Sequence, residues 1–247
     1  MSIKYELTDE AKNICGTTLH RIRALRDIPS AGVKSGDLGG WIEKESNLSQ
    51  NGDAWVYGNA EVYDNVLVFG DAKVYGNAKV RGNAKVYGYA RVFGNALVYG
   101  DARVCGNAEV YDNAWVFGDA EVYGYAWVYG DAEVYDNARV FGDARVYGYA
   151  RVCSNARVCG GVEVCGNALV YGNADYMTFK NSWSSGRWFT YTRSNKMWKV
   201  GCFYGSGDEL IKKAYADSEL SGKCYEAIVR ATETIEAAKS EAKGGAR

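Results

Sequence analysis

A six-residue phrase repeats without interruption from Gly52 to Met177 and restricts the fold of this 247-residue chain more than any other feature. Its 21 copies follow the pattern Gly/Asp-Asn/Asp-Ala-x-Val-Tyr/Phe, as in GDAWVY, GNAEVY and GDAKVY. A short fixed period is typical of a solenoid, in which each unit buries its apolar face against its neighbours. Any function then depends on the outer positions and on the copies that depart from the pattern.

Each copy is predicted to form a short strand that follows a corner. Ala and Val are two residues apart, so both side chains point to the same side of an extended segment and fill a narrow interior. The x residue and the aromatic residue point outward. Gly-Asn and Gly-Asp readily adopt the left-handed backbone region, which predicts a corner in every copy.

The phrase resembles the hexapeptide repeat of left-handed parallel β-helices over residues 34–177. An inward aliphatic residue is followed four places later by a small one, as in Val56 and Ala60 or Val74 and Ala78. The resemblance implies a mainly β fold with three hexapeptides per coil and, over this length, about seven to eight coils. This chain departs from that family in one consistent way, because Tyr or Phe follows the aliphatic residue.

A coil of 18 residues predicts which outward side chains are neighbours on adjacent coils. Seven pairs carry opposite charges and three carry like charges, and this bias supports the register because opposite charges on adjacent strands attract by about 0.2–1 kcal/mol. The opposite pairs are Glu61–Lys79, Arg91–Glu109, Arg103–Glu121, Glu121–Arg139, Glu133–Arg151, Arg145–Glu163 and Arg157–Asp175. The like pairs are Lys73–Arg91, Lys85–Arg103 and Arg139–Arg157.

The segments before and after the repeats predict two further parts of the chain, because the end strands of a solenoid need caps. Residues 1–33 form the expected N-terminal β cap, with strands at Ile3–Leu7 and Thr18–Leu25 around an acidic, polar turn. The solenoid is expected to occupy residues 34–177, with residues 34–51 as a degenerate first coil. Residues 178–247 form a third part of different composition.

This third part predicts a β-hairpin followed by two helices. Aromatic-rich strands are expected at Arg187–Arg193 and Lys196–Tyr204, around a turn at Ser194-Asn195. A first helix is expected from Ser206 to Asp217, and a second from Glu219 or Ser221 to Lys239, followed by a frayed EAKGGAR end. The second helix has an apolar stripe that either docks on the hairpin or joins subunits. The stripe consists of Leu220, Cys224, Ile228, Ala231, Ile235 and Ala238.

Three segments resemble those of hexapeptide-repeat proteins from bacteriophages and prophage regions. They read LHRIRALRDI, GVKSGDLGGWIEKESNLSQNGDAWVYGNA and TFKNSWSSGRWFTYTRSNKMWKVGCFYGSGDELIKKAYADS. Some relatives carry an acyltransferase label, and acyltransferases built on this helix usually use a histidine near the coils as general base. The family offers no established catalytic residue to transfer to this sequence.

The single histidine, His20, lies in the expected N-terminal cap, and the repeats contain none. Histidine is the commonest general base near neutral pH, so its absence from the coils disfavours acyl transfer. A zinc site of the carbonic-anhydrase type would need three histidines. We therefore expect no catalytic residue and no cofactor, and we interpret His20 as a structural strand residue.

Two patterns imitate metal sites but follow from the repeat. Cys153, Cys159 and Cys165 are six residues apart, so successive copies place them on different faces of the coil, too far apart to share zinc. Corner aspartates suggest a calcium array, but asparagine fills the same slot about as often, so we interpret them as turn residues. They are Asp53, Asp71, Asp101, Asp119, Asp131 and Asp143. No metal is expected, and the odd cysteine count fits a reducing compartment.

The outward aromatic residues are expected to stack in three columns, one on each face. The first contains Tyr57, Tyr75, Phe93, Tyr111, Tyr129 and Tyr147. The second contains Tyr63, Tyr99, Phe117, Tyr135 and Tyr171, interrupted by Arg81 and Cys153. The third contains Phe69, Tyr87, Tyr123 and Phe141, interrupted by Cys105 and Cys159. Stacking stabilises the helix, but so much aromatic surface predicts a homo-oligomer, either a trimer or a dimer, or a face that meets a ligand.

Departures from the repeat identify the candidate binding residues. Three tryptophans take the outward x position and three tyrosines replace Asn or Asp at corners, and they are Trp55, Trp115, Trp127, Tyr89, Tyr125 and Tyr149. A late band of arginines adds Arg139, Arg145, Arg151 and Arg157. Arginines beside exposed aromatic rings bind phosphorylated or nucleobase ligands by pairing and stacking, and the alternative is that they only form the charge ladder. Trp127 is expected to lie over Arg145 in a cation–π pair.

Charge and hydropathy narrow the partner classes. The net charge of -1 provides no global field for long nucleic acid or an anionic membrane. No apolar run approaches the ~18 residues of a membrane span, and the N-terminus lacks the apolar stretch of a signal peptide. We therefore expect a cytoplasmic protein of a bacterial host cell.

Our hypothesis is a non-catalytic binding protein of phage or prophage type. Its aromatic and arginine-bearing surface would bind a host protein or sequester a small phosphorylated, nucleotide-like ligand. The alternatives are an acyltransferase-like enzyme with an unrecognised base and a self-assembling structural β-helix. The elaborate end segments argue against end-to-end stacking, because caps prevent it.

Overall fold

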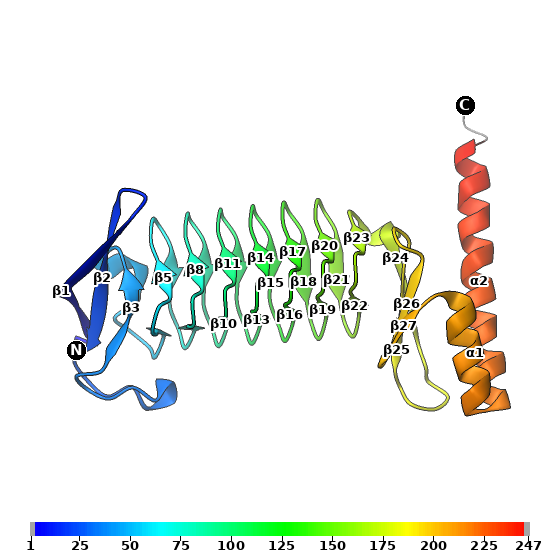
Figure 1. Cartoon of the computed structure of the whole chain (residues 1–247), viewed down its shortest axis with the longest axis horizontal. Coiled ribbons are helices and arrows are strands. Elements are labelled where there is room, and N and C mark those ends of the chain that lie inside the picture. Colours follow the sequence, from blue (N-terminus) through cyan, green and yellow to red (C-terminus); the bar gives the residue numbers. More distant parts are fainter. Residues whose placement is uncertain (1–2, 245–247) are drawn as a thin grey trace. The chain divides into compact units, whose positions relative to one another are not determined.

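The structure is a computed structural model that describes residues 3–244, and the chain divides into two compact units. The first unit comprises Met1–Asp175 and the second Tyr176–Arg247. The first unit is a parallel β-solenoid of about seven turns, whose coils are seen edge-on in Figure 1. The second unit is an antiparallel sheet with two helices.

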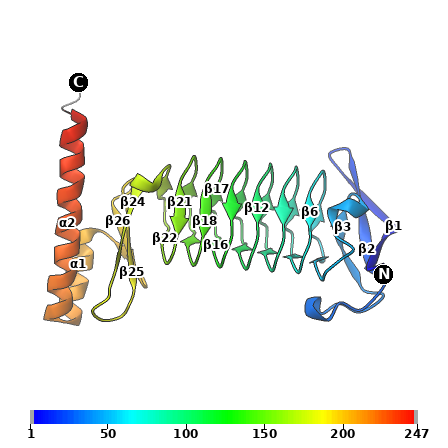
Figure 2. The same cartoon turned by 180° about the vertical axis from the view of Figure 1, so that it is seen from behind.

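Three sheets form the sides of the solenoid. The ten-stranded sheet contains β1 (Tyr5–Ile14), β2 (Thr17–Ala24), β3 (Leu38–Ile42), β5 (Glu61–Val62), β8 (Lys79–Val80), β11 (Leu97–Val98), β14 (Trp115–Val116), β17 (Glu133–Val134), β20 (Arg151–Val152) and β23 (Leu169–Val170). The seven-stranded sheet contains β4 (Trp55–Val56), β7 (Lys73–Val74), β10 (Arg91–Val92), β13 (Glu109–Val110), β16 (Trp127–Val128), β19 (Arg145–Val146) and β22 (Glu163–Val164). The six-stranded sheet, visible in Figure 2, contains β6 (Leu67–Val68), β9 (Lys85–Val86), β12 (Arg103–Val104), β15 (Glu121–Val122), β18 (Arg139–Phe141) and β21 (Arg157–Cys159).

Strand pairing confirms the 18-residue coil. Parallel partners such as Arg91 and Glu109 are 18 residues apart, and the arginine and glutamate side chains of this pair lie 3.3 Å apart. The expected Arg157–Asp175 strand pair is wrong, because Asp175 lies in the 3₁₀ helix η3 (Asn173–Asp175). There its carboxylate accepts hydrogen bonds from the backbone N–H groups of Tyr171 and Gly172, so it closes a turn.

The interior of the solenoid is built from the Ala and Val of each copy, which are completely buried in nearly every coil. Backbone ladders join the coils: the N–H of Arg91 donates to the Ala108 carbonyl at 2.9 Å, and that of Phe93 to the Val110 carbonyl at 2.9 Å. The backbone N–H and carbonyl groups of each interior strand are therefore hydrogen-bonded to the coils on both sides. The narrow apolar core determines which residues face outward.

Left-handed residues form the corners. Gly100 has φ of 73°, and a Cβ atom added there would lie 2.9 Å from the backbone nitrogen of Gly118 on the next coil. Asp112 tolerates a similar φ of 57°, and its carboxylate accepts a hydrogen bond from the N–H of Gly130 at 3.3 Å. The aspartates thus act as turn residues that also bond to the adjacent coil.

The N-terminal hairpin extends the ten-stranded sheet, since β2 pairs antiparallel with both β1 and β3. The expected polar turn is wrong, because β1 continues to Ile14 and the chain reverses at Cys15 and Gly16, with φ of 51° and 91°. The polar residues that suggested a turn lie within β1, where their side chains are exposed to water from the strand. In the first coil, β3 pairs in parallel with β5, and Leu48 bridges to Val68.

The second unit begins with a four-stranded antiparallel meander of β24 (Tyr176–Lys180), β25 (Trp188–Thr192), β26 (Met197–Val200) and β27 (Phe203–Gly205). The hairpin turn at Ser194-Asn195 is confirmed by the pairing of Thr192 with Met197. The single strand expected at Lys196–Tyr204 is wrong: a turn at Gly201, with φ of 54°, divides it into β26 and β27. Strand β24 was not expected from the sequence.

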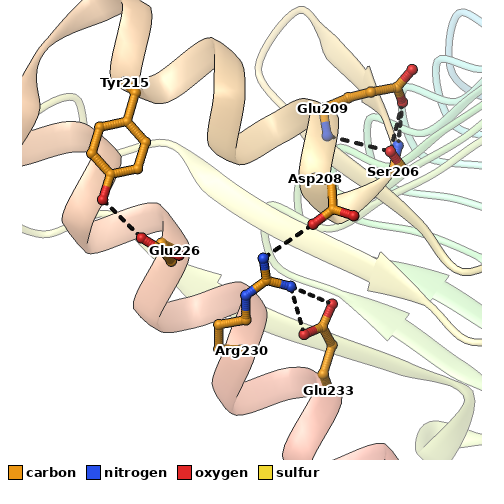
Figure 3. Close-up of polar contacts among 7 residues, drawn as sticks. All are labelled: Ser206, Asp208, Glu209, Tyr215, Glu226, Arg230 and Glu233. Carbon is orange, nitrogen blue, oxygen red and sulfur yellow. Dashed lines mark hydrogen bonds and ion pairs between the residues drawn. The ribbon is translucent and has the colours of Figure 1, made fainter.

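Helix α1 (Gly207–Asp217) begins as predicted, because Ser206 and Glu209 form a reciprocal capping box (Figure 3). Helix α2 (Glu219–Gly244) follows almost immediately. Arg230 of α2 joins the two helices, since its guanidinium contacts Asp208 at 3.1 Å and Glu233 at 2.9 Å (Figure 3). A second link is the hydrogen bond from the Tyr215 hydroxyl to Glu226, at 2.8 Å.

The expected apolar stripe of α2 is buried only in part, with Ile228 packed against the core of this unit. Leu220 is 67% exposed and Ile235 is 40% exposed, whereas Val229 and Thr232 are buried. The core of this unit comprises Phe189, Tyr191, Trp198, Val200, Leu210, Ile211 and Val229. Contacts with α1 set the rotation of α2, so the stripe turns partly to solvent. The helix continues to Gly244 instead of fraying after Lys239, and residues 245–247 of the EAKGGAR end lie outside the described residues.

Candidate binding site on the ten-stranded sheet

Trp55 is not a surface residue, so the expectation that it lies outward on an open face is wrong. Its side chain is 1% exposed and packs edge-to-face against Tyr5, with ring centroids 6.2 Å apart. Beside it, the Lys4 ammonium donates a hydrogen bond to the Ala54 carbonyl at 2.8 Å. The start of the N-terminal hairpin therefore covers the first outward tryptophan and makes it part of the core.

The three aromatic columns form as predicted, but they expose less surface than expected. Tyr75, Phe93, Tyr111, Tyr129 and Tyr147 stack with centroid spacings of 4.6–4.9 Å. Most column residues are half-buried because each ring covers the face of the next; of the column members, Phe69 and Tyr171 are the exposed ones. Stacking thus accounts for most of this surface without a partner.

Two of the corner tyrosines and one tryptophan lie along the seven-stranded sheet. Tyr89 and Tyr125 precede β10 and β16, and each is 63% exposed. Trp127 lies on β16, and the Arg145 guanidinium is 4.7 Å from the centre of its ring, which confirms the predicted cation–π pair.

Trp115, Tyr149 and Arg151 come together around a cavity of about 320 Å³ on the ten-stranded sheet. The remaining lining residues are Asn113, Asp131 and Glu133. Trp115 is 44% exposed and Tyr149 is 70% exposed, so both rings are available to a ligand. We call these six residues the Trp115 surface.

The repeat itself builds this surface in two adjacent rows. Trp115, Glu133 and Arg151 are paired neighbours at the x positions of β14, β17 and β20. The second row consists of the corner residues two places earlier in each copy. There an asparagine ladder links Asn59, Asn77, Asn95 and Asn113, and Asn113 donates to Asp131 at 3.1 Å. Tyr149 takes the next corner, where a phenol replaces the amide or carboxylate and projects into solvent.

The local charge of the Trp115 surface is negative. Arg151 pairs with Glu133, with Nε and Oε2 3.3 Å apart, which leaves the Asp131 carboxylate in excess. The pair is half-exposed and contributes little to stability. Aromatic faces beside excess carboxylate favour a cationic group over an anionic one.

The late arginines do not form one surface. Arg139 and Arg157 lie on the six-stranded sheet, Arg145 on the seven-stranded sheet and Arg151 on the ten-stranded sheet. Consecutive copies occupy consecutive sides of the coil, so a band along the sequence becomes a ring around the axis. Arg139 also contacts Glu121, with Nε and Oε2 3.3 Å apart, as the predicted charge ladder requires.

The residues that imitate catalytic or metal sites lie in structural positions. His20 is in β2, where its Nδ1 is 3.2 Å from the Thr8 carbonyl oxygen. Cys153, Cys159 and Cys165 lie on or directly after strands of three different sheets, as the repeat predicts. Within residues 3–244, no three His, Cys, Asp or Glu side chains are grouped closely enough to hold a metal ion. Over the same range, none of the helices combines the length and apolar character that crossing a membrane requires.

Comparison with known families matches segments of the repeats. A model described as the YdcK beta solenoid repeat matches residues 90–106, 132–148 and 138–154, all within the coils. A search of curated proteins found no match to the chain. The matched segment 132–148 includes Glu133 of the Trp115 surface, and the segment 138–154 includes Tyr149 and Arg151. The coiled part of this chain is thus similar to the YdcK beta-solenoid repeat.

Proposed function

We propose that this protein is a non-catalytic binding protein whose Trp115 surface docks a partner protein. The observation that carries the proposal is the convergence of Trp115, Tyr149 and Arg151 on one cavity. Tryptophan, tyrosine and arginine are the residue types that dominate the binding energy of protein interfaces. They lie on a rigid ladder, so little conformational entropy is lost when a partner orders them.

The charge of the site indicates what the partner presents. A lysine or arginine side chain of the partner can lie against the Trp115 ring, with its cationic group near Asp131 and Glu133. The same excess of carboxylate disfavours a phosphorylated ligand at this site. The resemblance of the flanking segments to phage and prophage proteins makes a cytoplasmic protein of the bacterial host the proposed partner.

Site-specific photo-crosslinking in host cells tests this proposal. A photoreactive amino acid at Tyr149 should crosslink to a distinct polypeptide, identified by mass spectrometry, whereas the same amino acid at Tyr125 should not. Both positions are exposed corner tyrosines, but they belong to different sides of the solenoid. A crosslink to a second copy of this chain would contradict a host partner and would indicate that the surface mediates self-association.

Matched substitutions separate binding from folding. Tyr149→Asn restores the residue that the ladder carries at most other corners, so it should leave the coil intact and weaken partner capture at least about tenfold, as should Trp115→Ala. Tyr125→Asn is the control and should bind normally. Equal capture by all three variants, or acetyl-CoA turnover that one substitution abolishes, would refute the proposal.

A further inference from the structure

The aromatic column of the six-stranded sheet has a gap between two stacked pairs of rings. Phe69 stacks on Tyr87 with centroids 4.8 Å apart, and Tyr123 stacks on Phe141 with centroids 4.9 Å apart. Cys105 occupies the rung between these two stacks. Because each coil advances by about 4.8 Å, the rings of Tyr87 and Tyr123 are separated by about 9.6 Å, which is the space for one more ring.

The missing rung is open. A cavity of about 220 Å³ lies at this position and is lined by Tyr87, Arg103, Cys105, Glu121 and Tyr123. Cys105 is partly exposed, and its side chain is smaller than the aromatic ring that most other copies carry at this position. We call these five residues the Cys105 slot.

A comparable interruption elsewhere in the solenoid is filled by the protein itself. In the column of the ten-stranded sheet, Arg81 replaces a ring, and its planar guanidinium lies 4.8 Å from the centre of the Tyr99 ring. That distance equals the ring spacing, so the guanidinium takes the place of the absent aromatic group. Cys105 has no planar group with which to do the same.

The slot is lined by the Arg103–Glu121 ion pair, and the x positions on either side of this pair add further positive charge. The x positions of this sheet carry Lys85, Arg103, Glu121, Arg139 and Arg157 along consecutive strands. Glu121 is shared by Arg103 and Arg139, each with a nitrogen 3.3 Å from a Glu121 oxygen. Lys85 and Arg103 are direct neighbours in the register, so cationic charge is concentrated at the edge of the slot.

We infer that the Cys105 slot binds a planar aromatic ring that carries an anionic group, of which a purine nucleoside monophosphate is the representative. The base completes the column by stacking between Tyr87 and Tyr123, and the phosphate lies against Arg103 and Lys85. The slot is on a different sheet from the Trp115 surface. Loss of one activity would therefore leave the other intact.

Calorimetric titration of the full chain with AMP and GMP tests this inference. At least one of the two should bind, with adenosine and ribose 5-phosphate each at least about tenfold weaker, because each lacks one of the two recognised groups. Arg103→Gln should weaken the nucleotide at least about tenfold and leave adenosine binding unchanged. Absence of binding by both nucleotides at about 1 mM would overturn the inference.

A matched pair of substitutions at the slot itself gives the sharper control. Cys105→Tyr supplies the missing ring, so it should abolish nucleotide binding and raise the melting temperature. Cys105→Ser leaves the slot open and should bind within about twofold of the parent chain. Equal nucleotide binding by the tyrosine and serine variants would contradict the stacking position.

Thiol protection provides a readout that does not depend on the variants folding. In the unmodified chain, bound nucleotide should slow the alkylation of Cys105 at least about fivefold, while the exposed Cys15 on the N-terminal hairpin reacts at its usual rate. Unchanged alkylation of Cys105 under saturating nucleotide would place the ligand elsewhere and refute the inference.

Discussion

Trp55 packs edge-to-face on Tyr5, with ring centroids 6.2 Å apart and an angle of 79° between the rings. The contact joins the first residues of the N-terminal hairpin to the first strand of the seven-stranded sheet. Tyr5 is fixed from the other side by its hydroxyl, which lies within hydrogen-bond distance of the carbonyl oxygens of Glu45 and Leu48, at 2.8 and 2.7 Å. Trp55 occupies an outward position of the repeat, but here it is part of the core beneath the N-terminal cap.

Trp55 and Trp115 occupy the same repeat position but should differ strongly in their contribution to stability. Trp55→Ala leaves a cavity in a closed core and should lower the free energy of unfolding by about 3–5 kcal/mol. Trp115→Ala removes a half-exposed ring and should cost less than about 1 kcal/mol. Urea unfolding followed by circular dichroism measures both, and similar losses would show that the cap does not bury Trp55.

Alkaline pH should destabilise the solenoid through its tyrosine column. Burial raises the pKa of Tyr57 and of Tyr111 to about 12, and it also raises the pKa of Tyr75 and Tyr129 above the ordinary value of 10.0. Above pH 10 the unfolded chain loses these protons while the folded chain keeps them. The stability is therefore complete below about pH 10 and falls as the pH rises toward about 12.

Urea midpoints between about pH 9 and about pH 11.5, with tyrosinate absorbance recorded in parallel, measure this effect. The Tyr57→Phe/Tyr111→Phe double variant retains both rings but removes two titrating groups, so its stability should fall less steeply with pH. A midpoint that does not change over this range would show that the column tyrosines titrate normally when folded.

Substitutions at Gly100 should show that the corner requires a left-handed backbone conformation and that a residue other than glycine can adopt it. Gly100→Ala places a Cβ atom in a left-handed conformation, 2.9 Å from the nitrogen of Gly118, and should cost about 1–3 kcal/mol. Gly100→Asp should cost less, since its carboxylate can accept from the next coil as Asp112 does.

Gly172→Ala is the matched control for the corner, because a Cβ atom there meets nothing within 4 Å. We expect its free energy of unfolding to stay within about 0.5 kcal/mol of the parent chain. Thermal unfolding ranks the three variants. If alanine were tolerated at Gly100 better than aspartate, the hydrogen bond between coils would not be the compensating interaction.

Glu61 should fasten the hairpin to the solenoid. Its Oε1 lies 2.8 Å from the Lys12 ammonium and its Oε2 lies 3.0 Å from that of Lys79. Glu61→Gln leaves two ammonium groups without a carboxylate and should cost about 1–3 kcal/mol. Hydrogen exchange should show faster opening of β1 and β2, whereas the exposed Glu10→Gln should leave it unchanged.

The same carboxylate predicts a loss of stability in acid. Burial alone would raise the pKa of Glu61, but the hydrogen bonds from Lys12 and Lys79 outweigh burial and hold this pKa below its ordinary value of 4.5. The stabilisation is present above about pH 4.5 and is lost as the pH falls through the lower pKa of the folded state. Glu61→Gln should abolish this part of the acid dependence; an unchanged acid profile would assign it to other groups.

The register of the coils followed from the sequence because one spacing constrains many residues at once. Arg103, Glu121 and Arg139 are 18 residues apart, and the structure places them in contact through Glu121. The Arg157–Asp175 pair was predicted wrongly because the repeat ends near Asp175, which lies in a 3₁₀ turn and not in a strand. Trp115 and Tyr149 could be identified from the sequence as exceptions to the repeat, and Arg151 as a member of the late arginine band.

Other features depended on contacts between distant segments. Nothing in the local sequence around Trp55 shows that Lys4 and Tyr5 cover it. The buried face of α2 could not be chosen from its apolar stripe, because the rotation of the helix depends on its contacts with α1. No feature of the sequence marked Asn113 and Asp131 as site residues, because both are regular corner residues of the repeat. They belong to the candidate site because they line the same cavity as Tyr149.

The sequence by itself determined the period, the inward Ala and Val, the outward aromatic columns and the vertical neighbours. These follow from local backbone geometry, because a strand alternates its side chains and a fixed repeat superposes every eighteenth residue. The tertiary structure decided which outward residues are covered, which ring positions are empty and which exceptions share one cavity. These depend on packing between segments far apart in the chain, and no repeat of six residues carries that information.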